Sequence, residues 1–188
     1  MFNAREMTPQ RIAAIASRTD RPVVLTGLMG AGKSTVGRRL AALMQVSFRD
    51  SDTAIEQAAQ RSIAEIFAEF GEPHFRDGER RVIARLIEEK HGVIAIGGGA
   101  FVDPSIRALI LERAIAVWID CDLATLVART RRRDTRPLLR NGDPAEILAR
   151  LHAERSPAYA EAPIRITAGD APHEATAVRI LEALEQWR

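Results

Sequence analysis

A glycine-rich octapeptide, GLMGAGKS at residues 27–34, limits the possible folds of this chain more than any other feature. It matches Gly-x-x-x-x-Gly-Lys-Ser at every required position, and it joins a continuous apolar run to a segment of helical spacing. In such a unit, the loop N–H groups and the helix dipole form a nest for anions. Lys33 is expected to reach the β- and γ-phosphates, and Ser34 to supply a Mg²⁺ ligand. The loop therefore predicts binding of a nucleoside triphosphate through Gly30, Ala31, Gly32, Lys33, Ser34 and Thr35.

Apolar runs of strand length alternate with segments of helical spacing along the rest of the chain. Strands are predicted at residues 22–28, 46–52, 93–99, 114–120 and 164–167. Helices are predicted at 33–44, 62–71 and 73–92, from Asp122 onward, and at 144–160 and 173–187. This order is typical of an α/β fold, in which a parallel sheet carries helices on both faces.

The length of 188 residues suits one domain, predicted over residues 21–188. Residues 1–20 form a polar extension, where Thr8 and Pro9 favour the start of a short helix. No run approaches the roughly 20 apolar residues of a membrane span, and the N-terminus lacks the layout of a secretion signal. The one cysteine, Cys121, excludes an internal disulfide and favours a reducing compartment. A cytoplasmic protein is therefore expected, with no membrane partner.

The phosphate-binding loop is shared by switch proteins, motors and kinases. The tetrapeptide Asn-Lys-x-Asp, which a guanine-binding switch would be expected to show, does not occur in this sequence. A large motor ATPase would need a longer chain. Small kinases therefore remain the natural class.

Two carboxylates flank Ser51 in the segment DSD, residues 50–52, at the predicted end of the second strand. Both can point toward the carboxyl edge of the sheet, where ligands of parallel α/β folds bind. One could hold Mg²⁺, and the other could accept the proton of an acceptor hydroxyl. The alternative is a helix N-cap beside a surface charge.

Two further clusters could form an acceptor site. In FRDGE, residues 75–79, Arg76 and Glu79 are three apart on one helix face, so the carboxylate can hold the guanidinium ready for a substrate carboxylate. A plain surface ion pair is the alternative. The triplet Gly97–Gly98–Gly99 ends a predicted strand, and its backbone entropy cost is explained where a ligand must touch the main chain.

The segments GLMGAGKST, DSD, FRDGE, GGGA, RPLL and ERSPAY, in this order and at these separations, closely resemble shikimate kinase. The resemblance covers residues 22 to 187. It implies a P-loop fold of the nucleoside-monophosphate-kinase type, with a five-stranded parallel sheet and a mobile lid. It also implies transfer of the γ-phosphoryl group of ATP to the 3-hydroxyl of shikimate, with Mg²⁺, on the route to chorismate and the aromatic amino acids.

The resemblance also assigns roles to individual residues. Asp52 would hold the accepting diol and act as base or orienting group, and Asp50 would lie near Mg²⁺ with Ser34. Acceptor binding would fall to Asp52, Arg76, Gly97, Gly98, Gly99 and Arg155. The catalytic residues would be Asp52, Lys33 and Arg136, and Arg129 would lie against the adenine.

Five arginines occupy RRRDTRPLLR, residues 131–140, where the resemblance places the lid over about 131–143. Arg136 would swing over the phosphates as an arginine finger in cis, and Pro137 restricts its backbone to extended conformations. A nucleic-acid arm is disfavoured, because the stretch has no aromatic residue for stacking and the net charge of the chain is only +2. A solvated loop is the other alternative.

Two rival functions stay open at this point. A kinase of the same frame could act on another hydroxy acid such as gluconate, although FRDGE with a triple glycine is not expected there. A non-catalytic sensor that binds ATP and shikimate is the rival from another class, although it would be expected to have lost Lys33, Asp52 or Arg136. A monomer is expected, because no exposed apolar helix stands out as an interface.

Overall fold

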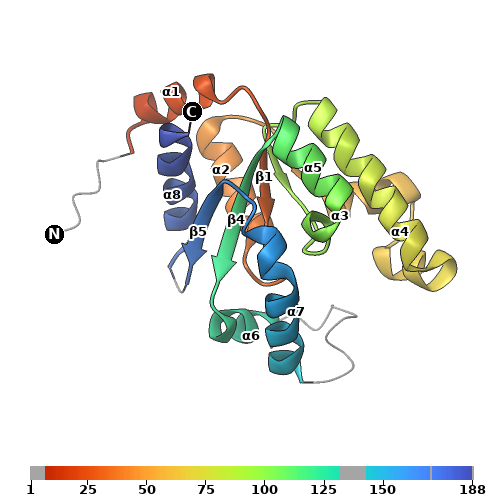
Figure 1. Cartoon of the computed structure of the whole chain (residues 1–188). Coiled ribbons are helices and arrows are strands. Elements are labelled where there is room, and N and C mark those ends of the chain that lie inside the picture. The colour runs from red at the N-terminus through yellow and green to blue at the C-terminus, as the bar shows by residue number, and fades with distance from the viewer. Residues whose placement is uncertain (1–6, 132–142, 170, 188) are drawn as a thin grey trace.

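A five-stranded parallel sheet forms the centre of the computed structural model, which describes residues 7–131, 143–169 and 171–187 (Figure 1). The strands are β1 (Val23–Thr26), β2 (Phe48–Asp50), β3 (Val93–Ala95), β4 (Ile115–Cys121) and β5 (Ile164–Ala168). Their order in the sheet is β2-β3-β1-β4-β5, so β1 lies in the middle. Val23 of β1 pairs with Val93 on one side and with Ile115 on the other. This confirms the predicted α/β class with five parallel strands.

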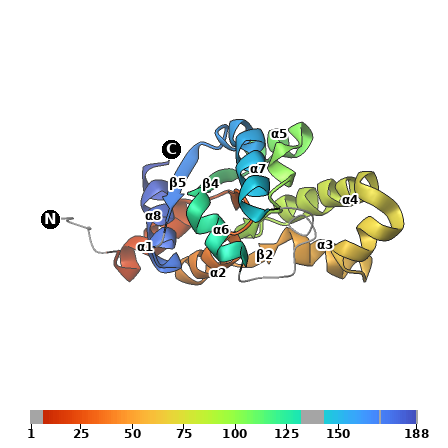
Figure 2. The ribbon, with the colours of Figure 1, turned by 90° about the horizontal axis from the view of Figure 1, so that it is seen from below.

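Helices cover both faces of the sheet, as the crossover connections of parallel strands require. One face is covered by α2 (Lys33–Met44) and α8 (His173–Gln186), which pack against each other. The second half of α4 (Ile63–Glu88) and α5 (Pro104–Arg113) pack together on the other face. At the carboxyl edge, α6 (Leu123–Arg131) and α7 (Pro144–Tyr159) project beyond the strands, and Figure 2 looks onto this edge.

The buried positions explain the strand assignments. All four residues of β1 and all three of β3 are buried, as expected for strands covered on both faces. In β5, at the edge of the sheet, buried and exposed residues alternate. A single cluster of buried side chains runs through the sheet and the facing sides of the helices, so the core is continuous.

Three predicted strands were too long, and the one predicted over 22–28 is confined to Val23–Thr26. The other two precede residues of the acceptor site. The strand predicted over 46–52 ends at Asp50, because the Asp50 side chain caps a new helix, α3 (Ser51–Ala59), by accepting from the N–H groups of Asp52 and Thr53. The strand predicted over 93–99 ends at Ala95, and the three glycines follow it as a turn that leads into the short 3-10 helix η1 (Ala100–Val102). Of these last two corrections, the first moves Ser51 and Asp52 into the start of α3, and the second moves the glycine triplet into a turn.

Helix α4 is continuous except for a sharp kink at Gly71. Gly71 has φ 78° and ψ 173°, which glycine adopts without the steric cost that other residues would meet. The helix begins at a capping box formed by Ser62 and Glu65, as the sequence predicts. The predicted stop at Gly71 is therefore real, but a second helical stretch restarts at once, with Pro73 in its first turn.

The N-terminal extension contributes one helix, α1 (Pro9–Arg18), which is capped by Thr8. Ile12 and Ile15 are buried, and Arg11 forms an ion pair with Glu185 of α8 at 2.5 Å. Figure 1 shows α1 at the amino edge of the sheet, beside α2 and α8 and far from α6. Among the described residues, no helix is long and apolar enough to cross a membrane.

Candidate active site

The phosphate-binding loop lies between the end of β1 and the start of α2, as its motif predicts. Gly27, Gly30 and Gly32 all have positive φ, at 137°, 85° and 89°. A Cβ on Gly27 would lie 2.5 Å from the carbonyl oxygen of Ile119, so no side chain fits there. The loop is thus built from backbone, and its N–H groups lie beside the positive end of the α2 dipole.

Lys33 is the first residue of α2, and its ammonium group is held over the loop. Its Nζ donates to the carbonyl oxygens of Gly27 at 2.8 Å and Leu28 at 3.0 Å. The positive charge therefore lies where an anion bound in the loop would meet it. This arrangement can bind a polyphosphate.

Ser34 and Asp50 come together beside the loop. The Ser34 hydroxyl donates to Oδ2 of Asp50 at 2.6 Å, while Oδ1 of Asp50 accepts from the N–H of Asp52 at 3.1 Å. The alternative interpretation of Asp50 as a helix cap is therefore confirmed, since one carboxylate oxygen caps α3 while the other contacts Ser34. A hydroxyl and a carboxylate oxygen are hard ligands of the kind that Mg²⁺ takes together with phosphates and water.

Asp52 lies on the other side of Asp50, facing the glycine triplet. A Cβ on Gly97 would lie 3.0 Å from Oδ1 of Asp52 and 3.0 Å from Oε1 of Glu79. The two carboxylates thus share the space that a side chain at Gly97 would fill. The close approach of backbone and acidic groups explains why glycine is needed here.

Arg76 reaches the same triplet from α4. Its guanidinium contacts Glu79 at 2.7 Å and Glu72 at 3.0 Å, and both Nη atoms lie 3.0 Å from the Cβ position of Gly99. Burial raises the pKa of Glu79, and the contact with Arg76 opposes part of that rise. The predicted pair of Arg76 and Glu79 is therefore partly buried and lies against the glycine triplet, so it is not a surface ion pair. The contact between Arg76 and Glu72 is the exposed one.

Arg155 approaches the triplet from α7. Its Nη1 lies 3.3 Å from the Cβ position of Gly98. Two guanidinium groups, from Arg76 and Arg155, therefore flank three consecutive glycines, with Asp52 at their other end. Such a site fits a small molecule with one carboxylate and several hydroxyls, because paired guanidinium groups bind carboxylates strongly.

Arg129 lies close to the phosphate-binding loop. Its Nη2 donates to the carbonyl oxygen of Gly169 at 2.9 Å, and its Nη1 lies 3.9 Å from the Cβ position of Gly32. Within the described ranges, that Nη1 is buried and has no hydrogen-bond partner. The predicted nucleotide residue is thus placed at the loop. Arg136, by contrast, lies outside the described residues.

Three site residues, Ser51, Tyr159 and His173, were missed by the sequence reasoning, and Glu79 was only partly described. Ser51 accepts the N–H of Gly97 at 3.1 Å, and Tyr159 donates its hydroxyl to the carbonyl oxygen of Gly98. Glu79 was read only as a partner of Arg76, although it also faces Asp52. The ring of His173, at the start of α8, lies against Gly32. The Tyr of ERSPAY and the Ser of DSD were the available signals, since both belong to motifs already singled out.

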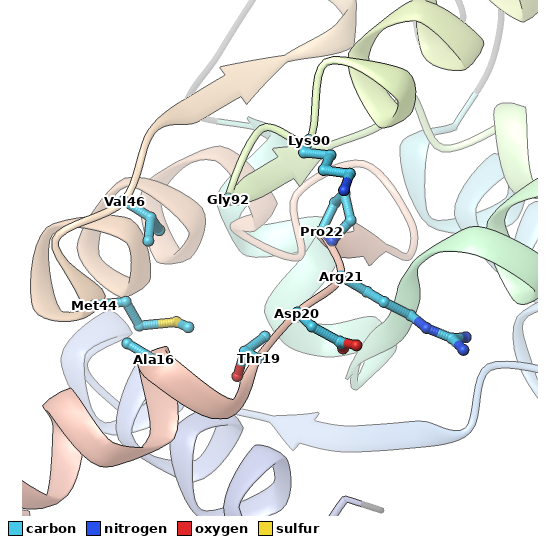
Figure 3. Close-up of a pocket in the computed structure, with 9 residues that line it drawn as sticks. All are labelled: Ala16, Thr19, Asp20, Arg21, Pro22, Met44, Val46, Lys90 and Gly92. Carbon is cyan, nitrogen blue, oxygen red and sulfur yellow. The ribbon is translucent and has the colours of Figure 1, made fainter.

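A cavity of about 130 Å³ lies at the opposite, amino edge of the sheet and takes no part in this site (Figure 3). Its walls come from the end of α1, the segment that leads from α1 into β1, the end of α2 and the residues just before β3. Met44 and Val46 lie on the same side of it, while the Arg21 side chain points away. The cavity belongs to the packing of α1 on the domain, since the strands separate it from the phosphate-binding loop.

A phosphate-binding loop and a polar acceptor site at one sheet edge define a P-loop kinase for small molecules. Comparison with known proteins agrees. The model of the shikimate kinase family matches residues 29–185. The shikimate kinase of Novosphingobium aromaticivorans is 56% identical over 98% of both chains, and that of Caulobacter vibrioides is 55% identical over 88% of this chain and 83% of the relative.

Solved structures support the same conclusion. The shikimate kinase of Acinetobacter baumannii, solved in complex with shikimate, superposes with a TM-score of 0.86 at 35% identity, covering 92% of this chain and 97% of the other. The chain belongs to the shikimate kinase family. It is an enzyme, a kinase.

Proposed function

We propose that this enzyme transfers the γ-phosphoryl group of ATP to the 3-hydroxyl of shikimate. One observation carries the proposal: Asp52, Arg76 and Arg155 converge on the glycine triplet at the same sheet edge as the phosphate-binding loop. Shikimate has one carboxylate and three ring hydroxyls, which matches two guanidinium groups near one end of the site and the Asp52 carboxylate at the other. The shikimate kinases compared above, one of which has a structure in complex with shikimate, support the same acceptor.

ATP, the phosphoryl donor, would be held by the residues of the phosphate-binding loop. Backbone N–H groups of Gly30, Ala31 and Gly32 bind the phosphates, with Ser34 and Thr35 at the start of α2. Lys33 moves from the carbonyls of Gly27 and Leu28 to the β- and γ-phosphates. Arg129 uses its buried, unpartnered Nη1 toward the nucleotide, with its guanidinium plane against the adenine.

The pair Ser34 and Asp50 would hold Mg²⁺. Their oxygen atoms fit a hard cation that keeps most of its water and takes the rest of its ligands from phosphates. A Mg²⁺ ion held by these residues would neutralise part of the charge on the transferred phosphoryl group. The protein residues contribute the position, since Asp50 is fixed by its capping of α3.

Shikimate, the phosphoryl acceptor, would be oriented by charged side chains at both of its ends. Arg76 and Arg155 bind the carboxylate of shikimate, and backbone atoms of Gly97, Gly98 and Gly99 contact the ring. Asp52 accepts a hydrogen bond from the reacting hydroxyl, orients it and takes its proton as the new P–O bond forms and the bond from the γ-phosphorus to the leaving oxygen of ADP breaks. The sequence resemblance adds Arg136 as the residue that closes over the phosphates.

We further propose a monomeric, cytoplasmic enzyme that binds no nucleic acid. A single, buried cysteine, Cys121, fits a reducing compartment. The net charge of +2 gives little attraction for a polyanion.

The experiment is ADP release with MgATP and, in separate reactions, shikimate, gluconate or no acceptor. We expect turnover that depends on shikimate and background rates in the other two reactions. Equal or faster turnover on gluconate would reassign the acceptor. Nucleotide binding with no turnover on either compound would favour the sensor instead.

A further inference from the structure

Two buried hydroxyl groups hold the glycine triplet from opposite sides. Ser51 is fully buried and accepts the N–H of Gly97, and Tyr159 is 1% exposed and donates to the carbonyl oxygen of Gly98. Ser51 comes from the start of α3, whereas Tyr159 comes from the end of α7, 61 residues from Gly98. The triplet has no side chains of its own, so these bonds decide the direction of its peptide groups.

The Tyr159 hydroxyl also sets the orientation of the next N–H. In a trans peptide the C=O and the N–H point in opposite directions. Because the Gly98 carbonyl points toward Tyr159, the N–H of Gly99 points away from it. Rotation of that single peptide would change which backbone groups a molecule beside Arg76 and Arg155 could bind.

The ring of Tyr159 is itself fixed. It packs on Trp118 of β4 with ring centroids 5.8 Å apart, and Trp118 is 4% exposed. Arg155 lies one turn before Tyr159 on α7. Burial raises the pKa of the Tyr159 hydroxyl, and the positive charge of Arg155 opposes part of that rise. Tyr159 thus joins three parts of the acceptor site: the triplet, the Arg155 guanidinium and the sheet.

We infer that Tyr159 is a positioning residue for the acceptor, acting through the Gly98 peptide and Arg155, with Ser51 as its counterpart at Gly97. Neither hydroxyl needs to touch the acceptor. The inference rests on the proposed function, because the acceptor site is the one assigned above to shikimate.

Tyr159→Phe tests this, because it keeps the ring on Trp118 and leaves the Gly98 carbonyl without its donor. We expect KM for shikimate, and its Kd from calorimetry without nucleotide, to rise about 3- to 10-fold. KM for ATP and kcat should change less than twofold. Ser51→Ala should show the same split.

Trp118→Phe is the matched control. It removes part of the indole but keeps an aromatic ring for Tyr159 to pack on, and it keeps the Tyr159 hydroxyl, so we expect a lower Tm with KM for shikimate unchanged. A Tyr159→Phe protein with the KM for shikimate of the unmodified enzyme would overturn the inference. So would equal rises in both KM values, since those would indicate a structural role only.

Amide hydrogen exchange separates this inference from the proposed function. Without any ligand, Tyr159→Phe should speed exchange in the segment containing residues 97–99 while α2 stays protected. Unchanged exchange there would overturn the inference even if shikimate is the acceptor. If the unmodified enzyme fails to turn over shikimate, the proposed function fails. Faster exchange in Tyr159→Phe would even then support the inference that the Tyr159 hydroxyl holds the glycine triplet. If Tyr159→Phe does not fold, Ser51→Ala decides by the same measurements.

Discussion

The carboxylate of Glu79 lies 2.7 Å from the guanidinium of Arg76, and the glutamate side chain is 1% exposed while the arginine side chain is 29% exposed. A buried carboxylate needs a charged partner, because an unpaired one would lose its solvation without compensation. Glu79 therefore holds the Arg76 guanidinium from its buried side, and the exposed side of the guanidinium can bind a ligand. Glu72, which contacts the same arginine, is 62% exposed.

Glu79→Gln should weaken acceptor binding more than Glu72→Gln. The first substitution removes a shielded charge-assisted contact, worth about 1.5–3 kcal/mol. We expect the Kd for shikimate to rise about tenfold or more. The exposed pair at Glu72 contributes about 0–1 kcal/mol, so that variant should stay within about fivefold. Calorimetry on both proteins checks this, and equal effects would mean that burial of Glu79 does not matter for Arg76.

Stability should carry a pH signature of Glu79. Burial raises its pKa in the folded protein above the ordinary value of 4.5, so the folded state binds the proton more tightly than the unfolded state. The resulting stabilisation is complete below pH 4.5 and is lost as the pH rises through the folded pKa. Glu79→Gln lacks this component.

Urea unfolding of both proteins across that pH range is the check. The free energy of unfolding of the unmodified enzyme, minus that of Glu79→Gln, should fall as the pH rises above 4.5. A difference that is constant, or that rises with pH, would show that the contact with Arg76 outweighs burial.

Asp50→Asn should raise the Mg²⁺ concentration needed for half-maximal rate about tenfold or more at fixed ATP, because it removes a charged oxygen ligand. Stability should be nearly unchanged, since asparagine caps helices as well as aspartate does. Asp103→Asn is the matched control, because Asp103 caps α5 in the same way but its other carboxylate oxygen contacts Arg80 instead of Ser34. A Mg²⁺ dependence that is equal in the two variants would remove Asp50 from the metal site.

Gly99→Ala should displace Arg76. Gly99 has φ −88°, which alanine tolerates, so the only obstacle is the new Cβ at 3.0 Å from both Nη atoms. We expect the Kd for shikimate to rise several-fold, about 3- to 10-fold if one charge-assisted bond is weakened. Gly78→Ala is the control, since its Cβ would meet no atom within 4 Å. That variant should bind shikimate normally and unfold at a higher temperature, because alanine favours the helix by about 1 kcal/mol.

The sequence predicted well wherever local chemistry decides the structure. The turn at Gly27–Ser34, the cap at Ser62 and the break at Gly71 each depend on residues within a few positions of one another. The approach of Asp52, Arg76 and Gly97 followed from the rule that parallel strands end at one edge, together with the family resemblance.

Contacts between distant segments were not predictable in this way. Helical periodicity shows that Tyr159 lies one turn after Arg155, but it does not show that this face of α7 meets Gly98. Likewise, the hydrogen bond between Ser51 and Gly97 depends on β2 ending at Asp50. The sequence pattern of residues 46–52 did not show where this strand ends. The burial of Glu79 follows from the packing of α4 on the triplet, which a sequence pattern alone does not contain.

Shikimate-dependent ADP release by Asp52→Asn, measured beside the unmodified enzyme and with nucleotide affinity determined separately, tests the central claim most directly. Asparagine keeps the shape of the side chain but cannot take the proton of the hydroxyl. We predict a fall in kcat of about 10²- to 10⁴-fold, with the Kd for MgATP unchanged. An Asp52→Asn protein that keeps kcat within severalfold of the unmodified enzyme would contradict the assignment of Asp52, and with it the acceptor site described above.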